Sequence, residues 1–138
     1  MSIEEALSIL REKGYKMTER RKKILNFFNL ERSKYKTARD LYEYMESHYP
    51  GISFDTVYRN LHLYEKLGIL EATELNAEKH FRISCSGHHH HHFICKSCGT
   101  AKKINFCPMD YVGDFLQQHQ VDDHKFEVYG VCSACQVS

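Results

Sequence analysis

The first 84 residues of this chain contain no cysteine, and no part of it has a long apolar run. A membrane span, which needs about 20 consecutive apolar residues, is therefore not expected. A secretory signal is not expected either, because residues 2–10 carry two glutamates in a helical pattern. We expect a cytoplasmic protein without a membrane partner. In that reducing compartment the six cysteines, all after residue 84, favour metal ligation over disulfides.

Net charge is also low, at +1, which excludes a uniformly basic protein. The charge is nevertheless unevenly spread. Residues 11–39 contain eleven Lys or Arg and three Glu, a local excess of eight, whereas residues 85–138 contain four basic and five acidic residues. Such a patch suits a phosphate-backbone partner, and a solvated helix face is the alternative.

The first part of the chain has helical patterns. Four capping residues each precede apolar residues at helical spacing: Ser2, Thr18, Thr37 and Ser53. Two short strands are predicted next, at residues 69–74 and 80–84, with a polar turn at residues 76–79. Helices followed by a hairpin are the order of a winged helix-turn-helix.

A composition change at residues 85–87 predicts two domains, residues 1–84 and residues 85–138. In the second domain we expect strands at 88–95, 102–106 and 124–131, and a helix at 108–119. The predicted fold class is α+β, with an N-terminal winged helix-turn-helix domain followed by a small α/β domain.

Two Cys-x-x-Cys pairs stand in this second domain, Cys95 with Cys98 and Cys132 with Cys135. Such a knuckle places two thiolates on one side of a zinc ion, and two knuckles complete a closed tetrahedral shell. A redox-active dithiol is the rival interpretation for either pair alone. Two pairs together favour a structural zinc site that performs no chemistry.

Five consecutive histidines, residues 88–92, lead into the first knuckle. If they form a strand, His90 and His92 lie on one face and His89 and His91 on the other. The tract can therefore supply two different metal sites.

Cys85 is either a small buried residue or a metal ligand beside the histidines. A sulfur–nitrogen site of that kind would prefer zinc to ferrous iron. Cys107 has no assigned role. The candidate ligands that could join His89 and His91 are Asp110, His119 and His124.

Residues 56–61 (Thr-Val-Tyr-Arg-Asn-Leu), the predicted wing, the His-rich strand and the segment from His124 to Cys135 together resemble the ferric uptake regulator family. The resemblance covers nearly the whole chain, and residues 54–56 with the five histidines are most similar to the zinc uptake regulators. It implies a winged-helix DNA-binding domain, an α/β dimerisation domain and metal-dependent repression of uptake genes.

The resemblance also implies three sets of metal ligands. The structural zinc ligands would be Cys95, Cys98, Cys132 and Cys135. The regulatory ligands would be Glu71, Cys85, His90 and His92. A third site would use His89, His91, Asp110 and His124. Iron and peroxide sensors of the family have a histidine where this chain has Tyr35, which weighs against those metals.

For DNA, the resemblance implies base-edge and phosphate contacts by Tyr58 and Arg59 of the recognition helix. Lys16, Arg20 and Arg21 would approach the DNA backbone or minor groove. Tyr58 could instead be a core aromatic, but its place opposite the apolar face favours exposure.

The sequence therefore predicts a zinc-responsive repressor that binds double-stranded operator DNA as a homodimer, with zinc in structural and regulatory roles. An iron- or peroxide-responsive regulator is the alternative. No small-molecule substrate or catalytic residue is expected, because the chain has no His-Glu-x-x-His motif that a zinc hydrolase would use. A metal store would leave the winged-helix pattern unexplained.

Overall fold

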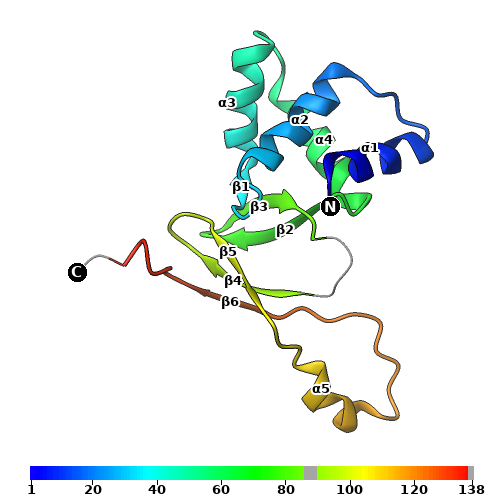
Figure 1. Ribbon diagram of the computed structural model, residues 1–138, viewed down its shortest axis with the longest axis vertical. Helices are drawn as coiled ribbons and strands as arrows, with labels where there is room; N and C mark the ends of the chain where they lie inside the picture. Colours follow the sequence, from blue (N-terminus) through cyan, green and yellow to red (C-terminus); the bar gives the residue numbers. More distant parts are fainter. Residues whose placement is uncertain (86–89, 137–138) are drawn as a thin grey trace. The chain divides into compact units, whose positions relative to one another are not determined.

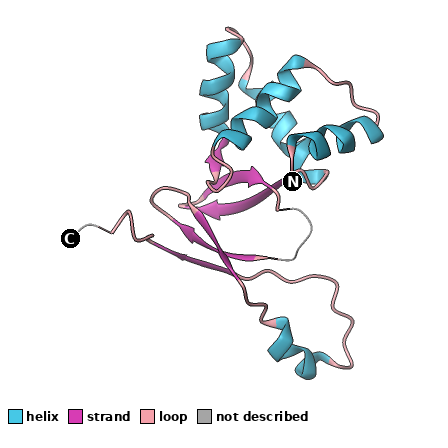
Figure 2. Ribbon diagram, in the orientation of Figure 1, coloured by secondary structure: helices cyan, strands magenta, loops and turns pink. Residues whose placement is uncertain are grey.

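The computed structural model describes residues 1–85 and 90–136. The chain divides into two compact units, Met1–Gly87 and His88–Ser138 (Figure 1). The first unit combines helices with a small sheet, whereas strands and loops dominate the second (Figure 2). Among the residues that the structure describes, no helix has both the length and the apolar character that crossing a membrane requires.

The helices of the first unit begin at the predicted capping residues. They are α1 (Ile3–Glu12), α2 (Glu19–Leu30), α3 (Ala38–His48) and α4 (Phe54–Lys66). Each cap side chain accepts a backbone N–H from the residue three positions later, which satisfies a donor that the helix itself leaves open. At α3 the cap is reciprocal, because the Asp40 carboxylate accepts the Thr37 N–H at 2.9 Å. The predicted caps are confirmed.

A three-stranded antiparallel sheet completes the first unit, in the order β1-β3-β2. Its strands are β1 (Lys36–Thr37), β2 (Leu70–Leu75) and β3 (Glu78–Ile83). Only Asn76 and Ala77 form the turn between β2 and β3, with φ values of 54° and 63°. The predicted four-residue turn is therefore wrong in length, and β1 was not predicted at all.

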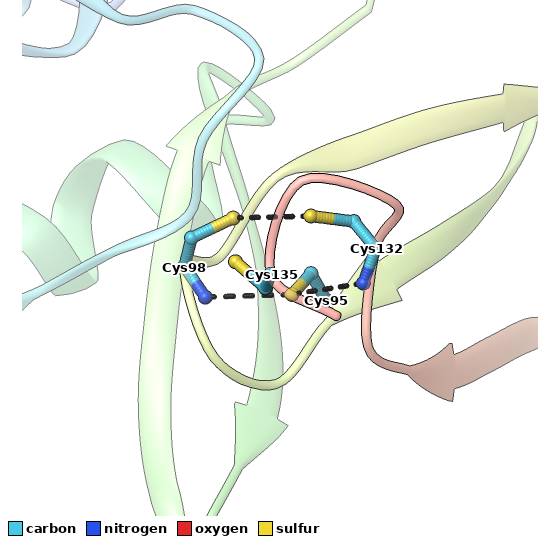
Figure 3. Close-up of side chains that lie close together, drawn as sticks. All are labelled: Cys95, Cys98, Cys132 and Cys135. Carbon is cyan, nitrogen blue, oxygen red and sulfur yellow. Dashed lines mark hydrogen bonds between the residues drawn. The ribbon is translucent and has the colours of Figure 1, made fainter. Parts of the chain in front are cut away.

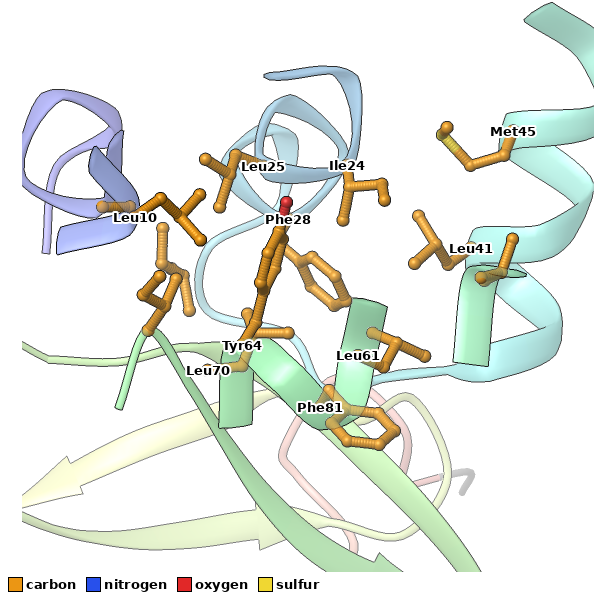
Figure 4. Packing of buried hydrophobic residues seen from close by; sticks show 14 of the residues in the cluster. Leu10, Ile24, Leu25, Phe28, Leu41, Met45, Leu61, Tyr64, Leu70 and Phe81 are labelled. Carbon is orange, nitrogen blue, oxygen red and sulfur yellow. The ribbon is translucent and has the colours of Figure 1, made fainter. Parts of the chain in front are cut away.

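The core of the first unit lies between the helices and one face of this sheet (Figure 4). Its largest fully buried side chains are Tyr64, Phe28 and Phe81. Burying one such side chain stabilises the fold by about 1.5–3 kcal/mol. Leu70 and Ile83 also belong to the core. Since strand side chains alternate, the neighbouring Glu71 and Arg82 lie on the other face of the sheet.

The second unit is a three-stranded sheet with β4 (His91–Cys95) at its centre. β5 (Ala101–Ile104) pairs with it antiparallel, and β6 (Glu127–Gly130) pairs with it parallel. Between β5 and β6 stand the short helix α5 (Met109–Val112) and the 3₁₀ turn η1 (Gly113–Leu116). The predicted α+β class is confirmed.

The predicted helix over residues 108–119 is wrong in extent, because α5 ends at Val112. Gly113, a weak helix former, follows at once. The apolar side chains also find little to pack against within the unit, since Tyr111 is 69% and Phe115 83% exposed. Without a buried apolar face, a short helix gains little stability from packing.

Candidate metal centres and nucleic-acid interface

The four paired cysteines lie together at one end of the second sheet (Figure 3). Cys95 ends β4, Cys98 follows in the turn before β5, and Cys132 and Cys135 stand after β6. Their sulfur atoms all lie within 4.8 Å of one another, and Cys98 and Cys132 are 3.8 Å apart. A tetrahedral zinc site with Zn–S bonds of about 2.3 Å needs sulfur atoms about 3.8 Å apart. The donor set and its spacing fit zinc.

Backbone amides around Cys95 favour its thiolate form. The Cys132 N–H donates to Cys95 Sγ at 3.3 Å, and the N–H groups of Ser97 and Cys98 donate at 3.4 Å. These donors, that of Cys132 foremost, outweigh burial and lower the pKa of Cys95 to about 6. The neighbouring sulfurs of Cys132 and Cys98 raise the pKa of Cys135 to about 12. Deprotonating all four sulfurs at this spacing therefore needs a cation to neutralise them.

A second cluster in the same unit contains His91, Cys107 and His124, whose candidate ligand atoms all lie within 4.8 Å of one another. His124 Nε2 is 3.3 Å from His91 Nε2 and 3.4 Å from Cys107 Sγ. A tetrahedral zinc ion would hold two nitrogens about 3.3 Å apart, and a nitrogen and a sulfur about 3.6 Å apart. Phe126 packs edge-on against the His91 ring and covers one side of the cluster.

This cluster differs from the predicted third site in one ligand. Asp110 is exposed in α5 and does not belong to it, whereas Cys107 does. His89, the remaining predicted ligand, lies outside the described residues. Sequence reasoning missed Cys107 because the other candidate ligands of its cluster, His91 and His124, are 16 and 17 residues away along the chain. The available signal for Cys107 was its place directly before Pro108, the N-cap residue of α5.

The predicted regulatory ligands are distributed over both units. His92 lies in β4, adjacent to His91 and on the opposite face of the strand, and His90 precedes the strand. Glu71 and Cys85 belong to the first unit, where both contact Arg82. The Arg82 guanidinium donates to the Glu71 carboxylate, and its two terminal nitrogens each lie 3.6 Å from Cys85 Sγ.

The strand register explains why Glu71 and Cys85 share this arginine. Glu71 and Arg82 are directly opposite each other across β2 and β3, and Cys85 follows Arg82 by three residues. Burial opposes the charge of Arg82, but the Cys85 sulfur, Glu71 and Tyr35 outweigh it and raise the pKa of Arg82 above its usual range. Arg82 was not among the predicted site residues.

The exposed face of α4 carries the predicted recognition residues. Val57, Leu61 and Tyr64 of this helix are buried, whereas Tyr58 and Arg59 are exposed. Arg59 Nε is held 3.1 Å from Asp55 Oδ2 one turn earlier. The helix therefore presents an oriented arginine to solvent.

One basic residue of α2, Arg21, reaches the same surface. Arg21 lines one hollow together with Arg59 and with Thr56, Asn60 and Leu63 of α4. The Arg21 guanidinium also donates to the Lys16 carbonyl at 2.6 Å, which places Lys16 beside it. Arg20 lies elsewhere, over the Tyr49 ring at 5.2 Å. Positive side chains from α2 and α4 thus meet at one surface, the arrangement that a phosphate backbone requires.

A model of the ferric uptake regulator family matches residues 12–130. The chain belongs to this family. It is 51% identical over 136 residues to the "Ferric uptake regulation protein" of Staphylococcus epidermidis, which covers 99% of this chain and 98% of that protein.

Two solved structures share the fold. The Helicobacter pylori ferric uptake regulator, whose structure is described as revealing three functional metal binding sites, has a TM-score of 0.74 at 18% identity, covering 100% of this chain and 96% of that one. A zinc uptake regulator complexed with zinc and DNA has a TM-score of 0.71 at 22% identity, covering 96% and 91%.

Family membership confirms the broad prediction from sequence. The protein is a metal-responsive transcriptional regulator that binds DNA, and it is not an enzyme. One relative is named for iron, and one solved structure with the same fold is bound to zinc.

Proposed function

We propose that this regulator is a zinc-responsive repressor, which binds operator DNA as a homodimer when zinc occupies its regulatory site and so represses zinc uptake genes. It acts in the cytoplasm, where its operator is. The observation that carries the choice of zinc is the pair Glu71 and Cys85, which are both in contact with the Arg82 guanidinium. A thiolate ligand is soft, and it favours zinc over ferrous iron or manganese.

The surroundings of this pair support the same choice. Tyr35, at the position where the iron and peroxide sensors have a histidine, is only 4% exposed, and Arg82 lies over its ring at 5.8 Å. A neutral phenol packed against a guanidinium offers no imidazole nitrogen to ferrous iron. The ligand set of the first unit therefore consists of a sulfur and a carboxylate.

In the proposed mechanism Glu71 and Cys85 of the first unit and His90 and His92 of the second are ligands of one ion. Bound zinc supplies a cross-link between the two units. The two units would then keep one relative orientation. This lowers the conformational entropy that is lost when a dimer binds two half-sites on DNA. By linkage, operator DNA should tighten zinc binding to the same degree.

Three further assignments belong to this proposal. The paired cysteines hold a structural zinc, which stabilises the second unit and takes no part in sensing. The cluster of His91, Cys107 and His124 is a third metal site, with sulfur in place of the carboxylate expected at Asp110. The dimer contact includes Phe115 and Tyr111 of the second unit, because large apolar side chains left exposed mark association surfaces.

A metal titration of DNA binding tests the choice of metal. A duplex selected from a random-sequence library in excess zinc serves as the probe, and its binding is measured with zinc, ferrous iron or manganese buffered at trace levels. Zinc should switch on binding at the lowest free concentration. Activation by ferrous iron at a lower free concentration than zinc would establish the iron-responsive alternative, which the name of the Staphylococcus relative favours.

Cys85→Ser tests the site itself. This variant should keep its structural zinc and its fold but need much more zinc to bind the probe, whereas Cys107→Ser, a cysteine outside the regulatory set, should respond at a free zinc concentration close to that of the wild type. An unchanged zinc response in Cys85→Ser would remove Cys85 from the regulatory site.

A further inference from the structure

Arg82 is a buried cation that the proposed mechanism does not use. Only 8% of the surface of Arg82 is exposed. Its guanidinium contacts Glu71 and Cys85, which are both proposed metal ligands. A buried arginine that merely stabilised the hairpin would need one acidic partner. This one touches a carboxylate and a sulfur at the same time.

Further contacts prevent Arg82 from moving away freely. Its Nε donates to the Arg32 carbonyl at 3.2 Å, and its guanidinium lies over the Tyr35 ring. The guanidinium is therefore held by contacts beyond those to the two proposed ligands. Arg82 lies directly across from Glu71 on the same face of the hairpin. The pairing of β2 with β3 therefore places the positive charge beside the Glu71 carboxylate.

We propose that Arg82 is an internal counter-cation, which competes with zinc for Glu71 and Cys85 and so sets the free zinc concentration at which the regulator responds. This inference rests on the proposed regulatory site. A guanidinium that already neutralises the Glu71 carboxylate and contacts the Cys85 sulfur reduces what both groups gain from a zinc ion. Its fixed charge also repels any second cation that approaches the same atoms, and burial limits screening by water and salt.

A purely orienting role for Arg82 predicts the opposite effect. If its hydrogen bonds only held Glu71 and Cys85 in place for the metal, removing it would loosen the ligands and weaken zinc binding. If Arg82 competes with zinc, removing it leaves the Glu71 carboxylate without its counter-cation and takes a fixed positive charge away from the Cys85 sulfur, which strengthens zinc binding. The sign of the change in affinity separates the two roles.

The experiment measures zinc affinity by competition with a chromophoric chelator, using the full-length protein with its tightly held zinc retained. Arg82→Gln should bind regulatory zinc about tenfold more tightly than the wild type. Arg82→Met, which keeps an unbranched side chain to pack against Tyr35, should give the same change if Arg82→Gln folds poorly. Arg82→Lys, which keeps the charge, should stay closer to the wild type.

Lys79→Gln is the matched control. Lys79 lies on the same hairpin and also forms an ion pair, at 2.6 Å to Glu65, but it contacts neither proposed ligand. Its loss should leave zinc affinity unchanged. Thermal melts give a second measurement that does not depend on DNA. Without regulatory zinc, Arg82→Gln should melt below the wild type, and zinc should then raise its melting temperature by more than it raises that of the wild type.

Cys85→Ser separates this inference from the proposal beneath it. If Cys85→Ser loses regulatory zinc while Arg82→Gln binds zinc with equal or lower affinity, the site stands and the counter-cation role is wrong. If Cys85→Ser binds zinc as the wild type does, the regulatory site itself is wrong, and the role of Arg82 falls with it.

Discussion

The paired cysteines matter for the folding of the second unit because that unit has little apolar core. Ile94 and Cys95 are the buried hydrophobic residues found in the described part of the second unit, so the apolar core there is very small. Small units with so little apolar core usually depend on a bound metal ion or on disulfide bonds for stability. Of the paired cysteines Cys95 is the buried one, and it receives the backbone N–H groups.

Cys95→Ser should therefore remove the structural zinc and unfold the second unit, because metal binding and folding are coupled in such units. Native mass spectrometry should show loss of the structural zinc together with any zinc held by the other sites of the second unit, and circular dichroism should show that the helices of the first unit persist. Cys107→Ser is the control and should keep the structural zinc. A Cys95→Ser protein with full zinc content and an unchanged melt would contradict this prediction.

Cys107 should contribute a thiolate to the third site. Cobalt(II) bound at the third site should give a sulfur-to-metal charge-transfer band. In the Cys107→Ser variant the part of the absorption that comes from this site should disappear. Cys107→Asp restores an anionic ligand with oxygen in place of sulfur, so it should still bind metal but shift preference towards harder ions such as manganese. An identical cobalt spectrum in Cys107→Ser would exclude the sulfur as a ligand.

At the residue scale, sequence reasoning succeeded where partners are close along the chain. The Ser53 and Thr37 caps were predictable because each side chain and the amide it binds are three residues apart. Cys107 was missed because His124 is 17 residues away. Arg82 was missed because its acidic partner Glu71 is 11 residues away, although Cys85 is near it in sequence. The strand register and the course of the loops bring these residues together, and neither can be predicted from a local sequence pattern.

Among the elements, the β2–β3 hairpin has an unfavourable turn residue. Both turn residues have positive φ, which Asn tolerates but Ala does not, and a two-residue turn of this kind prefers Asn followed by Gly. Ala77→Gly should therefore stabilise the first unit by about 0.5–1 kcal/mol, after allowing for the greater chain entropy of Gly.

Urea unfolding followed by circular dichroism would measure this gain. Glu78→Gly is the matched control, since Glu78 belongs to β3 and a glycine in a strand should destabilise by about 0.5–1 kcal/mol. Equal effects of the two glycines would show that the turn carries no strain.

The α2–α4 surface should supply the electrostatic part of DNA binding. Arg21→Gln should weaken binding to any duplex and reduce the slope of log K against log[salt] by about one. Arg39→Gln provides a control from the same basic segment. Arg39 lies on α3 with its charge paired to Glu43 at 3.5 Å, and its loss should leave the slope unchanged. Equal effects would favour a generally charged surface over a defined interface.

The elements themselves were predictable to different degrees. Helices α1 to α4 follow from caps and apolar spacing, which are local. The two-residue β1 was not predictable, because it exists only through its pairing with Phe81 and His80. The helix predicted at residues 108–119 failed for the converse reason, since its apolar pattern is real but Tyr111 and Phe115 find little to pack against in the described part of this unit.

At the scale of the whole molecule, that unmatched apolar pattern predicts association. Phe115→Glu places a charge in the proposed dimer contact and should convert the dimer to a monomer in analytical ultracentrifugation. Gln118→Glu, an exposed neighbour that adds the same charge, should remain dimeric. A Phe115→Glu protein that sediments as the wild type does would move the contact elsewhere.

The strand β4 contributes histidines to both of its faces and ends at the first cysteine of the structural site. A shift of one residue in such a strand would exchange the two faces, so an insertion between His92 and Cys95 should not be tolerated. The histidine run behaves differently. Its five members are identical, so a deletion that shortens the run by one still leaves histidines at all four positions before Phe93. Length variation among related genes should therefore accumulate on the N-terminal side of this strand and be absent from its last three residues.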